Sequence, residues 1–287
     1  MTGIRILTAL LMAPAAIAAV LLLDTPWLVA ISAVVFLGAL WEWLRLAGLD
    51  DTLPRALLLL ANLLLMVTLV WASRTDAGGS LVLFKIGALI GVLWWLLAVL
   101  WLRRPRLGTG STALAGVGKL AAGTLAIVPA WCALALVHAG DAEPATVLPV
   151  AQGHVWLLLA LMIVWATDTG AYFTGRRFGK RKLAPVISPN KTLEGLAGGV
   201  LAGVLVALLM APLAGATTAQ LPLVAVLALV TVLFSVLGDL VESLLKRQAH
   251  AKDSGTLIPG HGGILDRVDS VLAALPVFAV GKIWLGL

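Results

Sequence analysis

The sequence predicts an all-α membrane protein, a polytopic bundle of about nine transmembrane helices with its functional site at the cytoplasmic interface. Of its 287 residues, 61% are hydrophobic and 12% are charged, whereas soluble domains have roughly 25% charged residues. The mean hydropathy is +1.06. Apolar runs of about 20 residues recur along the chain, and each is long enough to cross a hydrocarbon core of about 30 Å. Because lipid leaves free backbone groups unsatisfied, we expect these runs to be helices.

Proline and glycine separate the apolar runs and mark the gaps between the expected helices. The pattern predicts helices near residues 4–23, 27–46, 54–73, 81–102, 112–138, 155–175, 195–215, 222–247 and 268–286. The first run has no convincing cleavage site after it, so we interpret it as a membrane helix rather than a removed signal peptide. We expect N-terminal transmembrane helices over 1–110 and a catalytic transmembrane region over 111–287.

Positive charge is distributed unevenly over the loops. Lys and Arg residues gather at 103–106, 176–191 and 246–267. With nine alternating helices, these three segments fall on the same side of the membrane as the N-terminus. The positive-inside rule places that side in the cytoplasm. The sequence therefore predicts a multi-pass membrane protein whose N-terminus and three basic segments face the cytoplasm.

Several other features of the composition indicate membrane residence. The net charge of +6 agrees with the basic loops, and no basic patch interleaved with aromatic residues indicates nucleic-acid binding. Cys132 lies in an apolar run, where we expect a buried thiol that forms no disulfide. Most tryptophans, including Trp43 and Trp95, fall near predicted helix ends, and we interpret them as an interfacial belt. The sequence leaves open whether the protein forms a homodimer.

Membrane anchoring does not explain a first polar region at residues 165–195. Asp168 falls inside an apolar helix, where an ionisable group usually lines a cavity or meets a partner. Tyr172 lies four residues further on, so both can share one helix face. Residues 188–192 offer hydroxyls, an amide and an ammonium at an expected helix start, where free N–H groups favour phosphate. The candidate substrate-binding residues here are Asp168, Tyr172, Lys182, Ser188, Asn190, Lys191, Thr192 and Glu194.

A second polar region spans residues 238–270. Acids and bases at 239–247 have the spacing that gathers side chains on one helix face. Asp266 and Asp269 follow, three residues apart, at the start of the last helix. Carboxylates from two helix ends can converge on a divalent cation, and magnesium prefers one or two carboxylates with waters and substrate phosphates. The glycine-rich turn at 260–263 can direct backbone N–H groups inward to bind an anion.

Acids for a metal, bases for phosphate and a flexible loop suit phosphoryl or nucleotidyl transfer, which depends on positioning and charge neutralisation. The candidate catalytic residues are Asp239, Lys246, Arg247, Lys252, Asp253, His261, Asp266, Arg267 and Asp269. The candidate metal ligands are Asp239, Glu242, Asp266 and Asp269, and Gly262 and Gly263 join the substrate-binding set.

Simpler explanations exist for each part. The basic loop at 176–191 can serve only as a topology signal, and the glycine-rich turn can be an ordinary connection between helices. The carboxylates can be structural ion-pair partners of Lys246 and Arg267. A phosphate monoester is already ionised near neutral pH and needs no general base, so we expect a structural or hydrogen-bonding role for His261.

The second region resembles the signature of the phosphatidate cytidylyltransferase family over 243–269. The matching parts are a Ser-x-x-Lys-Arg pair at Ser243, Lys246 and Arg247, a Lys-Asp pair at Lys252 and Asp253, a His-Gly-Gly turn at 261–263 and an Asp-Arg-x-Asp ending at 266–269. The stretches 168–173 and 188–195 are similar to upstream blocks of the family, except that Leu193 stands where many members have tryptophan. The first four helices match only in hydrophobicity and position.

This resemblance implies a magnesium-dependent reaction, with Mn²⁺ as a substitute, in which an oxygen of phosphatidic acid attacks the α-phosphorus of CTP and diphosphate leaves. It implies Asp239 and Asp266 as metal ligands, with Glu242 and Asp269 as supporting acids. It further implies that the bases hold the triphosphate or the lipid phosphate, and these are Lys246, Arg247, Lys252 and Arg267.

Two other functions fit part of the pattern. A CTP-dependent lipid kinase would transfer the γ-phosphoryl group of CTP to a polyprenol-type alcohol. A transporter would place its polar site near the membrane midplane on broken helices. Most acids and bases here collect at one interface instead, and this distribution favours the enzyme.

Overall fold

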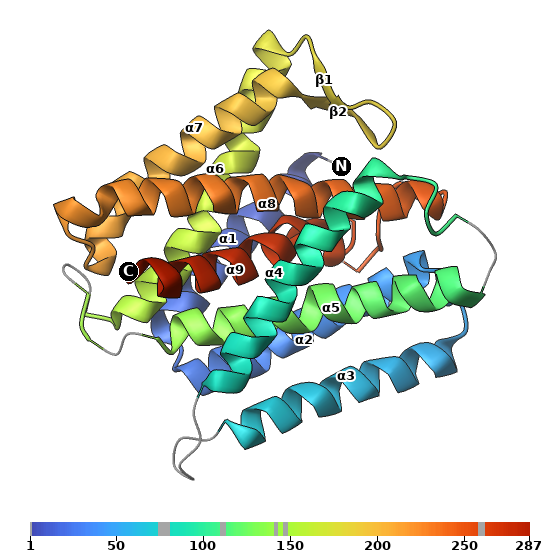
Figure 1. Cartoon of the computed structure of the whole chain (residues 1–287), viewed down its shortest axis with the longest axis horizontal. Coiled ribbons are helices and arrows are strands. Elements are labelled where there is room, and N and C mark those ends of the chain that lie inside the picture. The colour runs from blue at the N-terminus through green and yellow to red at the C-terminus, as the bar shows by residue number, and fades with distance from the viewer. Residues whose placement is uncertain (1, 74–80, 110–112, 141–142, 146–148, 258–261) are drawn as a thin grey trace.

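The structure is a computed structural model that describes the chain apart from residues 1, 74–80, 110–112, 141–142, 146–148 and 258–261. The described residues form nine α-helices and a two-stranded sheet (Figure 1). The helices are α1 (Thr2–Leu22), α2 (Thr25–Leu46), α3 (Thr52–Ala72), α4 (Val82–Arg103), α5 (Ala113–His138), α6 (Gln152–Phe178), α7 (Leu193–Met210), α8 (Leu221–Gln248) and α9 (Leu265–Leu285). The strands are β1 (Lys182–Ala184) and β2 (Ser188–Thr192), and two 3₁₀ turns, η2 (Ala211–Ala214) and η3 (Thr218–Gln220), join α7 to α8.

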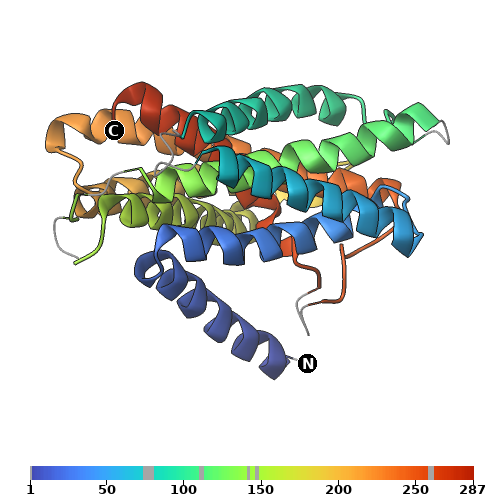
Figure 2. The same ribbon diagram turned by 90° about the horizontal axis from the view of Figure 1, so that it is seen from below.

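The predicted all-α polytopic membrane fold is confirmed. Among the described residues, eight helices are long and apolar enough to cross a membrane, and Leu11–Leu22 within α1 forms a shorter apolar helix. Figure 2 shows α1 running at an angle to the rest of the bundle. The largest difference from the expected boundaries is at α7, which ends at Met210 instead of near 215 and gives way to η2. The helix α6 also differs, since it continues beyond the expected 175 to Phe178. Arg176 and Arg177 occupy its last turn, where positive side chains interact favourably with the helix dipole.

The core is built around α5 and α9, which contact each other and both pack against α2 and α4. Three fully buried tryptophans join these helices. The indole N–H of Trp43 donates to Lys119 O at 2.9 Å, that of Trp95 to Leu272 O and that of Trp131 to Val29 O, both at 3.0 Å. Because apolar surroundings offer a buried N–H no water, a carbonyl partner is needed.

The interpretation of Trp43 and Trp95 as members of an interfacial belt is therefore wrong. Each is only 1% exposed and packs inside the protein. A tryptophan near a helix end can either face lipid headgroups or fill the space between helices, and the backbone carbonyls opposite these two rings satisfy their donors in the interior.

A short β-hairpin, absent from the sequence-based expectations, joins α6 to α7 and projects beyond their ends in Figure 1. β1 and β2 pair antiparallel, with Lys182 opposite Thr192. Glu194 stabilises the entry to β1 by accepting from the N–H groups of Lys180 at 2.9 Å and Arg181 at 3.2 Å. Thr192 caps α7 through its hydroxyl, which accepts from Gly195 N at 3.1 Å.

Candidate active site

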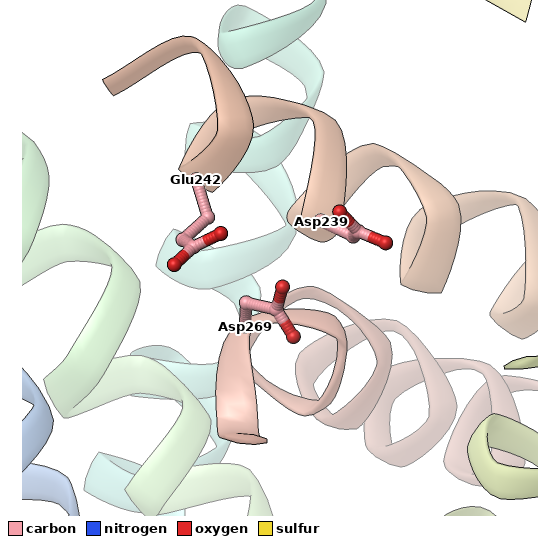
Figure 3. A group of neighbouring side chains, drawn as sticks. All are labelled: Asp239, Glu242 and Asp269. Atoms are coloured by element: carbon pink, nitrogen blue, oxygen red, sulfur yellow. The ribbon is translucent and has the colours of Figure 1, made fainter. Parts of the chain in front are cut away.

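Three carboxylates lie together where α8 contacts α9. Asp239 and Glu242 are on α8, and Asp269 faces them from α9 (Figure 3). A ligand oxygen from each lies within 4.8 Å of the others. Glu242 is almost fully buried, whereas Asp239 and Asp269 are partly exposed. We call Asp239, Glu242 and Asp269 the acid group.

Gly238 makes this close arrangement possible. A Cβ atom at this position would lie 2.4 Å from the carbonyl oxygen of Asp269 and 3.0 Å from the Cβ of Ala273. Only the missing side chain allows the backbone of α9 to approach α8 at this level. The acid group therefore depends on a glycine next to one of its own members.

The acid group is only partly neutralised by neighbouring lysines. Lys191 forms an ion pair with Asp239, and Lys246 forms one with Oε2 of Glu242. Oε1 of Glu242 is buried and has no hydrogen-bond partner in the described part of the chain. Such an oxygen is costly to leave unsatisfied. Because carboxylate oxygens are the preferred ligands of hard divalent cations, the residues present fit such a cation.

Asp266 lies outside the acid group, although the sequence paired it with Asp239. Its Oδ1 accepts from Lys246 Nζ at 2.8 Å, and its Oδ2 accepts from the N–H groups of Ser254 and Gly263, both at 2.9 Å. Asp266 belongs to the first turn of α9 and contacts both the preceding loop and Lys246 of α8. Asp269, three residues later, lies beside Asp239 and Glu242. The structure thus joins Asp239 to Asp269 and uses Asp266 to order the loop.

A cavity of about 760 Å³ adjoins the acid group at Asp239. Residues of α6, β1, β2, α7 and α8 line it. Asp168 and Tyr172 both face it, as their spacing on one helix predicted. The candidate substrate-binding residues that line it are Asp168, Tyr172, Ser188, Asn190, Lys191 and Thr192. Through the ion pair of Lys191 with Asp239, the two polar regions of the sequence form one continuous site.

Comparison with known proteins connects this site to a family. The sequence model of the cytidylyltransferase family matches residues 3–283. The chain belongs to the cytidylyltransferase family. A phosphatidate cytidylyltransferase of Pseudomonas aeruginosa is 42% identical over 285 residues, covering 96% of this chain and 94% of the relative. One of Haemophilus influenzae is 37% identical over 301 residues, covering 96% of each chain, and one of Bacillus subtilis is 50% identical over 128 residues, covering 43% of this chain and 46% of the relative.

The chain is thus a multi-pass membrane nucleotidyltransferase. Several other candidate residues of this cytidylyltransferase lie away from the cavity lining. Lys182 is exposed on β1, and Glu194 holds the backbone before β1. The side chain of Arg247 donates from Nε to Ile187 O at 3.3 Å, which ties α8 to the hairpin. Lys252, Asp253 and Arg267 are exposed around the loop before α9, and His261 lies outside the described residues.

The expected anion site at the glycine-rich turn is not formed at Gly263, because its N–H donates to Asp266. Gly262 has a φ of 84°, in the left-handed region that favours glycine. A Cβ on Gly262 would also lie 2.8 Å from Oδ2 of Asp266. In the described part of this turn, Gly262 and Gly263 allow the backbone to pass close to the carboxylate of Asp266.

Sequence reasoning missed Glu42 and Arg45, two charged residues of α2 that contact Ser254 in the loop before α9. A signal was present, since Glu42 and Arg45 are charged residues of a helix that is otherwise largely apolar. Their position more than 200 residues before the loop conceals the connection until the chain is folded.

We expect Gly238→Ala to disrupt the acid group, because the added methyl group pushes α9 away from α8. Activity should fall at least tenfold, and the melting temperature should drop. The control is Gly118→Ala in α5, where a Cβ meets nothing within 4 Å and alanine should be neutral or stabilise the helix by about 0.5–1 kcal/mol. Equal activity and thermal stability of both variants would show that the acid group does not require this close approach.

Proposed function

We propose that this chain is a phosphatidate cytidylyltransferase, which converts CTP and phosphatidic acid to CDP-diacylglycerol and diphosphate. The observation that carries the proposal is the continuity of the acid group with the cavity through Lys191 and Asp239. A cavity among membrane helices that is lined by both polar and apolar residues suits a substrate whose chains stay in the bilayer and whose phosphate must meet a nucleotide. Relatives named for this activity cover nearly the whole chain.

We propose that the acid group holds Mg²⁺, with Mn²⁺ as a substitute. A cation bound there supplies charge neutralisation for the triphosphate and orientation of the phosphates. Asp239 and Asp269 offer partly exposed carboxylates from two different helices. Glu242 contributes a buried oxygen that no protein donor satisfies in the described residues. Magnesium commonly keeps substrate phosphates in its coordination sphere, so the cavity beside Asp239 suits the nucleotide.

The ammonium groups of Lys191 and Lys246 have separate roles in this proposal. Lys191 lines the cavity and is the base placed to hold a substrate phosphate beside Asp239. Lys246 lies between Glu242 and Asp266 and fixes both carboxylates. An oxygen of the lipid phosphate forms a bond to the α-phosphorus of CTP as the bond to diphosphate breaks. The attacking phosphate is already ionised, so the chain's residues position reactants and need not remove a proton.

We also propose that the protein resides in a bacterial inner membrane with the site facing the cytoplasm. The basic segments 103–106, 176–191 and 246–267 lie on the side expected for the cytoplasm by the positive-inside rule. CTP is a cytoplasmic metabolite in this scheme, so its binding cavity must open on that side.

Isotope-labelled CTP tests the reaction and its side of the membrane. With purified protein and phosphatidic acid, label from the α-phosphate should enter lipid and γ-label should leave as diphosphate. Transfer of γ-label to a lipid alcohol would instead establish a CTP-dependent lipid kinase. In membrane vesicles, externally added CTP should react in inside-out vesicles only. Reaction in sealed right-side-out vesicles would contradict the proposed orientation.

Asparagine variants test the acid group. Asp239→Asn and Asp269→Asn keep the side-chain size but remove the charge, so each should lower kcat/KM by at least about 10²-fold, or about 2.7 kcal/mol of transition-state stabilisation. Chelation should abolish wild-type activity, and added Mg²⁺ or Mn²⁺ should restore it. Asp51→Asn, at an exposed turn between α2 and α3, is the matched control and should remain active. Near-normal activity of both test variants at limiting Mg²⁺ would leave these aspartates as structural ion-pair partners.

A further inference from the structure

Glu42 is a buried acid on α2, only 3% exposed, and the other buried residues of α2 are apolar apart from Ser32. Burying a carboxylate is expensive unless hydrogen bonds compensate for the lost water. Glu42 lies about 200 residues before the acid group in the sequence. Its partners therefore indicate why an acid occupies this position.

Both hydrogen bonds to Oε2 of Glu42 come from the segment that carries the signature residues. Ser254 Oγ donates at 2.9 Å, and Leu265 N donates at 2.8 Å. Leu265 is the first residue of α9, and its N–H is one of the donors that a helix start leaves without an intrahelical partner. Glu42 thus caps α9 from a different helix, and its negative charge also faces the positive end of the helix dipole.

The hydroxyl of Ser254 lies between two carboxylates, since its Oγ is 2.9 Å from Oε2 of Glu42 and 2.9 Å from Oδ2 of Asp266. A hydroxyl has a single proton to donate. Oδ2 of Asp266 already accepts two backbone N–H groups, while Oε2 of Glu42 has only Leu265 N besides the hydroxyl. We therefore infer that the Ser254 hydroxyl donates its hydrogen bond to Oε2 of Glu42. The Ser254 oxygen can then accept from the N–H of Asp266, 3.2 Å away.

Two glycines allow the loop to close around this carboxylate. A Cβ on Gly255 would lie 2.0 Å from Oε1 of Glu42, and one on Gly263 would lie 2.2 Å from Oε2. Arg45, one turn further along α2, donates to the carbonyl oxygen of Ser254. Two side chains of α2 and two glycines of the loop thus fix the same short segment.

We propose that Glu42 is a positioning residue that locks the loop and the first turn of α9 onto α2, and so sets where Asp269 stands relative to Asp239 and Glu242. Glu42 acts through Ser254 and the start of α9 and does not itself join the acid group. This inference rests on the proposed function of the acid group as the metal site. It assigns to an N-terminal helix a part in the geometry of a site built from α8 and α9.

Three substitutions of Glu42 distinguish a role in positioning the acid group from a role in the stability of the fold alone. Glu42→Gln keeps an oxygen that can accept both hydrogen bonds, so Mn²⁺ affinity and kcat should stay within about threefold of wild type. Glu42→Ala removes the acceptor, and Glu42→Asp withdraws it by one methylene while keeping the charge. Both should weaken Mn²⁺ binding, measured by electron paramagnetic resonance on purified protein, about tenfold or more. Their kcat at fixed Mg²⁺ should fall similarly, with a smaller change in KM for CTP.

The control is Asn62→Ala in α3, another buried polar residue of the N-terminal helices, whose amide donates to Leu58 O of its own helix at 2.8 Å. It should leave Mn²⁺ affinity unchanged, whatever its effect on thermal stability. If Glu42→Ala does not fold, Glu42→Asp and Glu42→Gln still decide the matter. The proposal is overturned if the Asp and Ala variants that fold bind Mn²⁺ as wild type does, or if Gln fails to rescue binding.

Asp239→Asn distinguishes failure of this inference from failure of the site assignment. If that variant binds Mn²⁺ normally, the acid group is not the metal site, and Glu42 has no such geometry to set. If Asp239→Asn loses Mn²⁺ binding while Glu42→Asp and Glu42→Ala retain it, the acid group stands and the positioning role of Glu42 is wrong.

Discussion

The contact between α8 and α9 at Gly238 is the constraint on which the site depends. Without a side chain at this position, the backbone of α9 approaches closely enough for Asp269 to face Asp239 and Glu242. Helices in a membrane gain little from the hydrophobic effect between them, and small residues allow the close packing that holds them together. Here the same close packing also concentrates negative charge, which Lys191 and Lys246 partly offset.

The elements around the contact between α8 and α9 supply positive charge and hydrogen bonds that hold the site in place. The hairpin between α6 and α7 brings Lys191 to Asp239, and Arg247 ties the same hairpin to α8. On the other side, Asp266 orders the loop before α9, and Glu42 reaches that loop from α2. A site formed by two helices is thereby fixed by residues from four different parts of the chain. This arrangement suits nucleotidyl transfer, in which accurate positioning provides much of the rate enhancement.

Local patterns were sufficient to predict the helices, because a run of apolar residues in lipid has few alternatives to a helix. The joint position of Asp168 and Tyr172 also followed from helical spacing. The hairpin could not be predicted in this way, since β1 and β2 are only three and five residues long and the start of β1 depends on Glu194. Trp43 and Trp95 were misplaced because sequence position does not reveal which face of a helix another helix covers.

The choice between Asp266 and Asp269 shows the same limit within the site. Both are acids at the start of α9, and spacing alone does not say which one joins Asp239 and Glu242 and which one binds the loop and Lys246. The distinction depends on the rotation of α9 against α8, which Gly238 permits, and on donors from Ser254 and Gly263 that claim Asp266. Glu42 was missed for a related reason, because its partners lie in a distant part of the sequence.

The central claim is that Asp239 and Asp269, with Glu242 beside them, hold the divalent cation. Anomalous X-ray diffraction from crystals of the wild-type protein grown with Mn²⁺ and CTP tests it most directly. The account expects an anomalous peak within coordination distance of carboxylate oxygens from both Asp239 and Asp269. A peak that Asp266 ligates without Asp269, or one remote from the contact between α8 and α9, would contradict it.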